Sequence, residues 1–164
     1  MAKRNQEQPL FNKNSITLEM NPMTNLRIKE SRNLRQVVDI IHDCWFELKA
    51  VQHDTTARTV SIGFNLENRE KSKTLKNYFL LRKIQIPYFE CYLRISNVES
   101  LLLDDTENVE SYDFNTLRFD PSLKKLNIKT GIPLTFEMTV SELDVSVQVT
   151  ENIAKWRTVR TAFW

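Results

Sequence analysis

Glycine is nearly absent from this chain: only Gly63 and Gly131 occur among its 164 residues. Loops that cradle phosphate groups need several glycines, because the backbone must approach the anion closely. Two widely separated glycines cannot build such a loop. The sequence therefore excludes a P-loop and a Rossmann dinucleotide site, and with them the enzymes that depend on these loops.

Cysteine and histidine are equally scarce, with two residues of each. Cys44 and Cys91 have apolar neighbours, and their number does not fit a secreted disulfide framework, although one disulfide between them stays open. Neither cysteine has a neighbour at zinc-finger or ribbon spacing. The acidic run 104–107 lacks the glycine and the regular ligand spacing of a calcium loop. We therefore expect no metal site and no cofactor.

Only one short cluster, His42-Asp43-Cys44, resembles a catalytic group. A cysteine becomes a nucleophile when an imidazole lies within hydrogen-bond distance. Cys44, however, shares the alternation phase of Phe46 and Leu48, and a buried free cysteine acts as a small hydrophobic residue. We therefore interpret Cys44 as structural, assign no catalytic residue, and favour a function that is not enzymatic.

Long apolar runs are missing too, and no stretch is long enough to span a bilayer. The polar start of the chain lacks the hydrophobic core of a signal peptide, so we expect a cytoplasmic protein without a membrane partner. The 23 Lys and Arg residues nearly balance 21 Asp and Glu, so no overall field attracts nucleic acid. Region 99–120 is acidic. The basic segment 69–83, which contains Tyr78 and Phe79, keeps nucleic-acid binding as a less favoured alternative.

Apolar residues are plentiful: they make up 41% of the chain, with nine Phe, four Tyr and three Trp. From Cys44 onward they alternate with polar residues, which is typical of strands with one buried face. We predict a mainly β domain (α+β at most) over 33–164, with about eight antiparallel strands in a sandwich or a strongly curved sheet. Segment 65–83 breaks the alternation and indicates a solvated loop or a hairpin tip, with 78–81 returning to the core. A parity change beside Pro87 indicates a bulge or a bend at a sheet edge.

A polar N-terminal arm, 1–32, precedes this domain. It is either a poorly ordered terminus or an added edge strand. Leu34, Val37, Val38 and Ile41 have helical spacing, so we predict a short helix at 34–42 with Asn33 as its N-cap.

The tail has helical spacing as well, which predicts a C-terminal helix at 152–163, whereas its threonines favour a strand. Its aromatic residues are too much apolar surface to leave in water. They either dock on the chain's own sheet or contact a partner. The candidate partner contacts are Trp156, Phe163 and Trp164.

Two hairpins share a residue pattern. Val51 to Ile62 and Leu117 to Ile128 both read apolar, two residues, Asp, two residues, apolar, basic, any residue, apolar, any residue, Ile. An Ile-Pro pair and a Phe-Glu pair then follow each hairpin in the same order. The pattern indicates an internal repeat, 44–107 and 112–150, whereas convergent turn chemistry is the alternative.

A repeat names no activity. We expect a non-catalytic protein-interaction or assembly module whose partner is another protein or a second copy of the chain. The alternative is a small-molecule-binding protein or enzyme that uses a pocket on the curved sheet.

Overall fold

The computed structural model describes residues 25–162. It contains ten strands, one 3-10 turn (η1, Ser31–Asn33) and one helix (α1, Leu34–Ile41) within that range. The strands are β1 (Asn25–Ile28), β2 (Trp45–Asp54), β3 (Thr59–Glu67), β4 (Lys73–Asn77), β5 (Leu81–Ile95), β6 (Val98–Asp105), β7 (Ser111–Asp120), β8 (Lys125–Thr130), β9 (Leu134–Val140) and β10 (Val145–Ala162). The predicted mainly β fold is confirmed, with ten strands instead of about eight. Between residues 25 and 162, no helix could cross a membrane.

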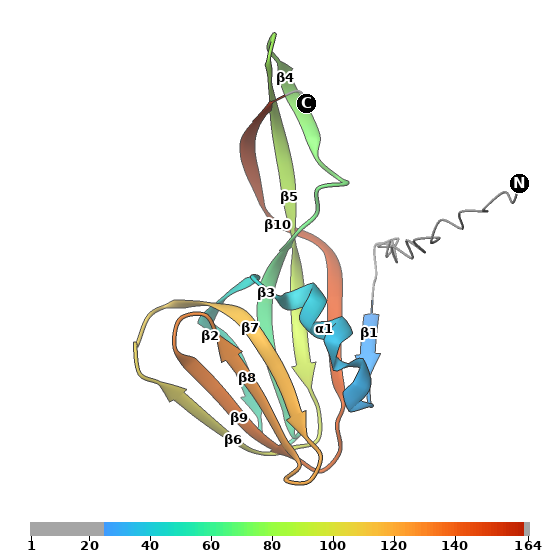
Figure 1. Ribbon diagram of the computed structural model, residues 1–164, viewed down its shortest axis with the longest axis vertical. Coiled ribbons are helices and arrows are strands. Elements are labelled where there is room, and N and C mark those ends of the chain that lie inside the picture. The colour runs from blue at the N-terminus through green and yellow to red at the C-terminus, as the bar shows by residue number, and fades with distance from the viewer. Residues whose placement is uncertain (1–24, 163–164) are drawn as a thin grey trace, which may run out of the picture.

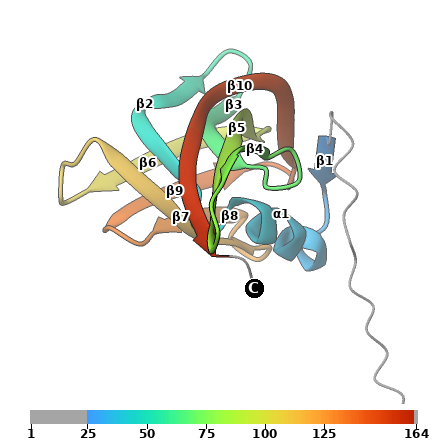
Figure 2. The ribbon, with the colours of Figure 1, turned by 90° about the horizontal axis from the view of Figure 1, so that it is seen from above.

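All ten strands belong to one antiparallel sheet. Their order is β1-β10-β5-β3-β2-β7-β8-β9-β6, and β4 pairs separately with β5. The sheet curves strongly around an interior, with its end strands β1 and β6 on opposite sides of the body, while α1 lies against β7 (Figures 1 and 2). Of the two predicted architectures, the strongly curved sheet is therefore the one observed.

Aromatic rings fill the interior of the curl. Phe46 stacks on Phe114 with ring centroids 4.5 Å apart, and Phe136 and Tyr112 lie 6.0 and 6.1 Å from the same ring. Alternate residues of β3, β5, β8 and β9 complete the core. They include Val60, Ile62, Leu93, Ile95, Leu126, Ile128 and Met138. The period of two seen in the sequence exists because one face of each strand points into this interior.

Helix α1 confirms the prediction at 34–42, and Asn33 occupies the predicted N-cap position without capping the helix through its side chain. Leu34, Val37 and Ile41 are buried on one face of the helix. Asn33 makes no side-chain capping hydrogen bond, and its φ of −95° and ψ of −4° are already helical. An N-cap residue needs an extended backbone before its side chain can reach the first turn. The preceding 3-10 turn removes that conformation.

The predicted C-terminal helix at 152–163 is absent; β10 runs as a strand to Ala162. Its register against β5 continues from Val145 opposite Ile95 to Ala162 opposite Leu81. β5 extends equally far and offers backbone partners, and β-branched residues such as Val159 fit a strand better than a helix. Phe163 and Trp164 lie outside the described residues, as do residues 1–24. At the other terminus, β1 adds an edge strand to the chain's own sheet.

The strand order reads the same outward from the β2–β7 pair in both directions. From β2 the order is β3, β5, β10, and from β7 it is β8, β9, β6. Phe46 lies opposite Tyr112 at the centre. The outer strands are exchanged, because β6 follows β5 in the chain but pairs with β9, while β10 follows β9 but pairs with β5. Each half of the sheet is therefore completed by a strand from the other half of the chain.

The two hairpin turns also match. In each turn an aspartate carboxylate accepts the backbone N–H three residues ahead, at 2.8 and 3.2 Å. The fourth residue after the aspartate is left-handed, with φ of 54° and 52°, and its carbonyl accepts an N–H at 2.9 Å in both turns. The residues, in that order, are Asp54, Ala57, Arg58 and Val98 in the first turn and Asp120, Leu123, Lys124 and Val140 in the second. Identical residue spacing thus accompanies identical backbone geometry.

Neither the Ile-Pro match nor the Phe-Glu match beyond the turns holds. Ile62 and Ile128 correspond when the turns are matched. Leu93 lies opposite Ile62, and Phe136 lies opposite Ile128. Phe136 therefore corresponds to Leu93 and not to Phe89. The sequence alignment was misplaced because the connection before β5 is long, so the position of the alignment gap could not be fixed from the sequence.

The parity change beside Pro87 coincides with an irregularity in the neighbouring strand. β5 itself pairs with β3 without interruption as far as Tyr88. The register shifts lie in β10, between Val149 and Lys155. The bend thus occurs between paired strands inside the sheet and not at its edge, and it marks the point where β5 and β10 leave the body.

Candidate functional site: a cationic stalk with an apolar tip

Three strand segments leave the body side by side and form a projection (Figure 1). We call this projection the stalk and define it as residues 69–85 and 153–162. The first part of β5 is its middle strand, with β4 on one side and the last part of β10 on the other. β8 and β9, in contrast, are joined by residues 131–133 alone. The stalk is therefore an addition that the other half of the sheet lacks.

Bulky apolar residues form the end of the stalk, which we call the tip (residues 78–81). Phe79 is 95% exposed and Leu80 67% exposed, with Tyr78 and Leu81 about half exposed. The Tyr78 N–H donates to the Leu81 carbonyl at 2.7 Å, which closes the turn. Contiguous exposed apolar surface marks interaction sites in soluble proteins. The expectation that 78–81 returns to the core is therefore wrong, and these four residues form an exposed apolar surface that the sequence did not indicate.

The stalk concentrates positive charge. It carries nine Lys and Arg residues and one Glu, whereas the rest of the chain carries 14 basic and 20 acidic residues. Two segments far apart in the sequence contribute, and they meet only because β10 pairs with β5. The near-neutral net charge of the whole chain conceals this separation.

Three of these cations form a row across the stalk. Lys83 of β5 lies opposite Lys76 of β4 and opposite Arg160 of β10. Directly opposed residues in an antiparallel sheet point to the same face, and like charges there destabilise the sheet. None of the three forms an ion pair with another described residue. The row is therefore suited to a negatively charged partner.

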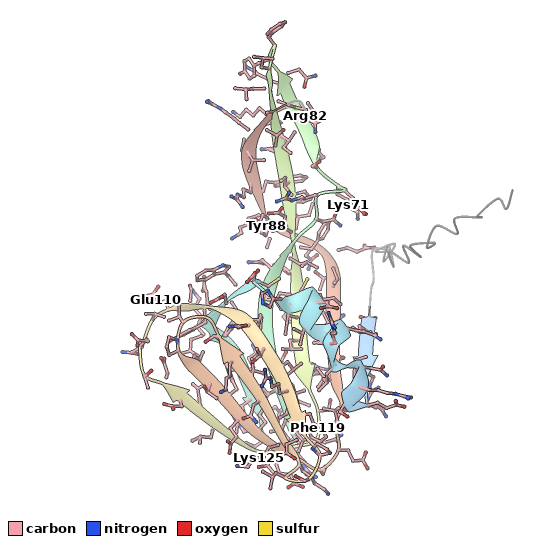
Figure 3. All side chains as sticks on the ribbon, in the orientation of Figure 1. Lys71, Arg82, Tyr88, Glu110, Phe119 and Lys125 are labelled. Carbon is pink, nitrogen blue, oxygen red and sulfur yellow. The ribbon has the colours of Figure 1, made fainter. Side chains whose placement is uncertain are left out.

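At the base of the stalk, by contrast, the charges are compensated. Glu67 accepts hydrogen bonds from the Tyr88 hydroxyl at 2.6 Å and from Arg69 Nε at 2.5 Å, and Arg157 Nη1 lies 3.7 Å away. The Tyr88 hydrogen bond and these two guanidinium groups lower the pKa of Glu67. Figure 3 marks Tyr88 at this base and Arg82 near the tip. The row of Lys76, Lys83 and Arg160, which has no such ion pairs, lies in the other part of the stalk.

Of the predicted partner contacts, only Trp156 can be placed. It lies in the stalk opposite Pro87 and is 38% exposed. The Lys73 ammonium sits 4.8 Å from the centroid of its ring. A cation over an aromatic face is attracted by the ring quadrupole, so Trp156 is partly covered by its own chain. Phe163 and Trp164 lie outside the described residues.

The His42-Asp43-Cys44 cluster offers no activated nucleophile. His42 Nδ1 lies 3.0 Å from the Asp43 carboxylate, and the Cys44 thiol donates to the Ile40 carbonyl at 3.5 Å. Burial raises the pKa of Cys44 to about 11 and that of Cys91 to about 12. A nucleophilic cysteine requires a lowered pKa. Both cysteines are free thiols, and residues 25–162 contain no group of His, Cys, Asp and Glu arranged for a metal ion.

An open groove of about 960 Å³ lies between the body and the stalk base. His42 and Cys44 line it, as do Glu47, Glu67 and Glu90, whereas His53 does not. Each of these carboxylates already binds a neighbouring side chain. General acid–base catalysis needs a carboxyl or imidazole that is free to reach a substrate proton. The groove has the size of a ligand site, but these three carboxylates already have partners within the chain.

Comparison with protein-family models, with curated proteins and with solved structures finds no match for this chain.

Proposed function

We propose that this protein is a non-catalytic assembly module whose contact element is the stalk. The observation that carries the proposal is the tip, where four consecutive apolar residues stand exposed at the end of a projection. Exposed apolar surface costs solubility, so its presence favours a role in binding. The cation row behind the tip adds a preference for a negatively charged partner.

The matching turns and strand orders support a second part of the proposal, that the body consists of two related halves. In this view the body is a scaffold, and the stalk is what distinguishes one half from the other. The expected cytoplasmic location belongs to the proposal as well. Its support is that Cys44 and Cys91 are free thiols, as is usual in reducing compartments.

Nucleic-acid binding is the second candidate, favoured by the row of Lys76, Lys83 and Arg160. Phosphate contacts would make such binding fall steeply with salt. The tip argues for protein contact instead, since two of its four residues are leucines, which cannot stack on bases. The volume of the groove favours the binding of a small molecule there. The carboxylates that line it argue against this function, because they already bind neighbouring side chains.

The test removes apolar surface from the tip and leaves the fold alone. The tip variant is Phe79→Ser with Leu80→Ser, and the matched control is Leu123→Ser, a leucine 62% exposed in the β7–β8 turn. Because all three side chains lie at the surface, each variant should unfold within about 0.5 kcal/mol of wild type. Light scattering of the purified protein and the size of its complexes in extracts of the source cell measure association. We expect the tip variant alone to lose it.

Two results would contradict the proposal. One is a large loss of stability in the tip variant, which would make the tip a structural element. The other is the same size for wild type, tip variant and control in both settings, which would mean that the tip contacts nothing.

A further inference from the structure

A second charged region lies on the body, and we call it the acidic lobe (residues 102–113). It comprises the end of β6, the connection to β7 and the start of β7. The lobe contains five carboxylates and no Lys or Arg: Asp104, Asp105, Glu107, Glu110 and Asp113. None of them forms an ion pair with a described residue. Like Lys76, Lys83 and Arg160 of the stalk, these carboxylates have no ion-pair partner among the described residues.

Apolar side chains accompany the carboxylates in the lobe. Leu102 is 63% exposed, Leu103 39% and Val109 37%. Exposed leucines beside carboxylates complement the stalk, where exposed apolar residues stand beside cations. The lobe thus offers carboxylates for the cations of the stalk and apolar side chains for its apolar tip.

Both regions also contain an edge strand. β6 ends the sheet, and no described strand pairs with its outer side. β4 is the outer strand of the stalk, pairs only with β5 among the described strands, and is exposed at all five residues. Edge strands carry unpaired backbone N–H and C=O groups that can accept another strand. Backbone pairing is therefore available to the same two regions.

The two regions lie apart in the molecule. The stalk projects from the body, whereas the lobe lies at its side, where Figure 3 marks Glu110. Both sit at the far end of an exchanged strand: β10 ends beside the start of β5, and Asp105 of β6 lies opposite Leu134 at the start of β9. The end of the exchanged strand is thus basic in one half of the sheet, at the stalk, and acidic in the other half, at the lobe.

From this complementarity we infer that the stalk of one copy binds the acidic lobe of a second copy. This inference rests on the proposed function and names its partner. The contact is heterologous, since it joins two different surfaces and leaves each copy with a free stalk or a free lobe. Copies therefore add head to tail, into a ring if the rotation closes and into a chain if it does not.

The test uses two variants that each remove one side of the contact. The stalk variant is Lys76→Glu with Lys83→Glu, and the lobe variant is Asp104→Lys with Glu107→Lys. Sedimentation velocity at low salt should find multimers for wild type and monomers for each variant alone. A mixture of the two should assemble again, because the unchanged lobe of one variant meets the unchanged stalk of the other and the two reversed surfaces also carry opposite charges. Molar salt should weaken the wild-type contact roughly tenfold or more, since it shortens the Debye length from about 10 Å to about 3 Å.

A charge-matched control is Arg32→Glu with Arg35→Glu, whose side chains are 80% and 89% exposed in η1 and in the first turn of α1. It should assemble like wild type. If a charge variant fails to fold, the tip variant replaces the stalk variant, and Leu102→Ser with Leu103→Ser replaces the lobe variant.

Three outcomes overturn the inference: a wild type that stays monomeric, variants that assemble alone, or a mixture that does not assemble. A monomeric wild type whose stalk instead binds single-stranded DNA or phosphatidylserine vesicles overturns it in favour of another partner class. Complexes in source extracts that depend on the tip, with a monomeric purified protein, also overturn it but leave the proposed function standing.

Discussion

Replacing Lys124 by glycine should stabilise the protein. Lys124 has a φ of 52° in the β7–β8 turn. A residue with a Cβ loses roughly 1–2 kcal/mol in the left-handed region, because Cβ approaches the following carbonyl oxygen. Glycine avoids that contact but loses about 0.5–1 kcal/mol more conformational entropy on folding. The difference leaves a gain of about 0.5–1 kcal/mol for Lys124→Gly.

Urea unfolding with a thermal scan measures this gain. For a chain of this size we expect the melting temperature to rise by about 1–4 °C. Lys124→Ala is the control, since it removes the same charged stem but keeps Cβ, and it should gain nothing. The reasoning is refuted if Lys124→Gly is no more stable than Lys124→Ala.

The equivalent turn extends the test. Arg58 has a φ of 54° but also binds the Glu99 carboxylate at 3.1 Å. Both Arg58→Gly and Arg58→Ala lose that ion pair, so the difference between them reports the backbone alone. It should equal the difference between Lys124→Gly and Lys124→Ala if the two turns are equivalent.

Two further predictions concern titration. Thiol reagents should modify the native protein slowly near about pH 8, because burial raises the pKa of Cys44 to about 11 and of Cys91 to about 12; rapid native labelling would contradict this. Arg27 donates to both carboxylate oxygens of Asp144, and these hydrogen bonds lower the pKa of Asp144 from its usual 3.8. A lowered carboxyl pKa stabilises the fold above the unfolded value and loses its effect as pH falls through the folded value. Urea unfolding at several pH values should therefore find the advantage of wild type over Arg27→Gln constant above about pH 5 and shrinking below about pH 4, whereas a pH-independent difference would refute the assignment.

Elements with one buried face could be predicted from the sequence. Val145, Val147 and Val149 alternate because they fill the core of the curled sheet, and the polar residues between them do not. The helix over Leu34–Ile41 was equally accessible, since its buried stripe sets the spacing of its apolar residues. In both cases the spacing of the apolar residues follows from the one face of the element that is buried in the core.

The stalk escaped prediction because most of it covers no interior. Without a buried face, the spacing of Ile153, Trp156 and Val159 fits a helix as well as a strand, and only pairing with β5 decides between them. The tip likewise looked like core because four apolar residues normally are core. The positive charge of the stalk could not be predicted either, since its two segments, 69–85 and 153–162, are far apart in the sequence and become adjacent only through strand pairing.

The exchange of outer strands has a consequence for synthesis of the chain. β10 emerges from the ribosome after the nine other described strands, yet it fills the place between β1 and β5. Until it emerges, β1 has no partner, β5 keeps an open edge, and the stalk lacks its third strand. Co-translational folding of the first half therefore cannot finish early, although domains commonly fold as they are made. Nascent chains halted before residue 145 should need chaperone protection of the β5 edge, and release of β10 is the step that ends this dependence.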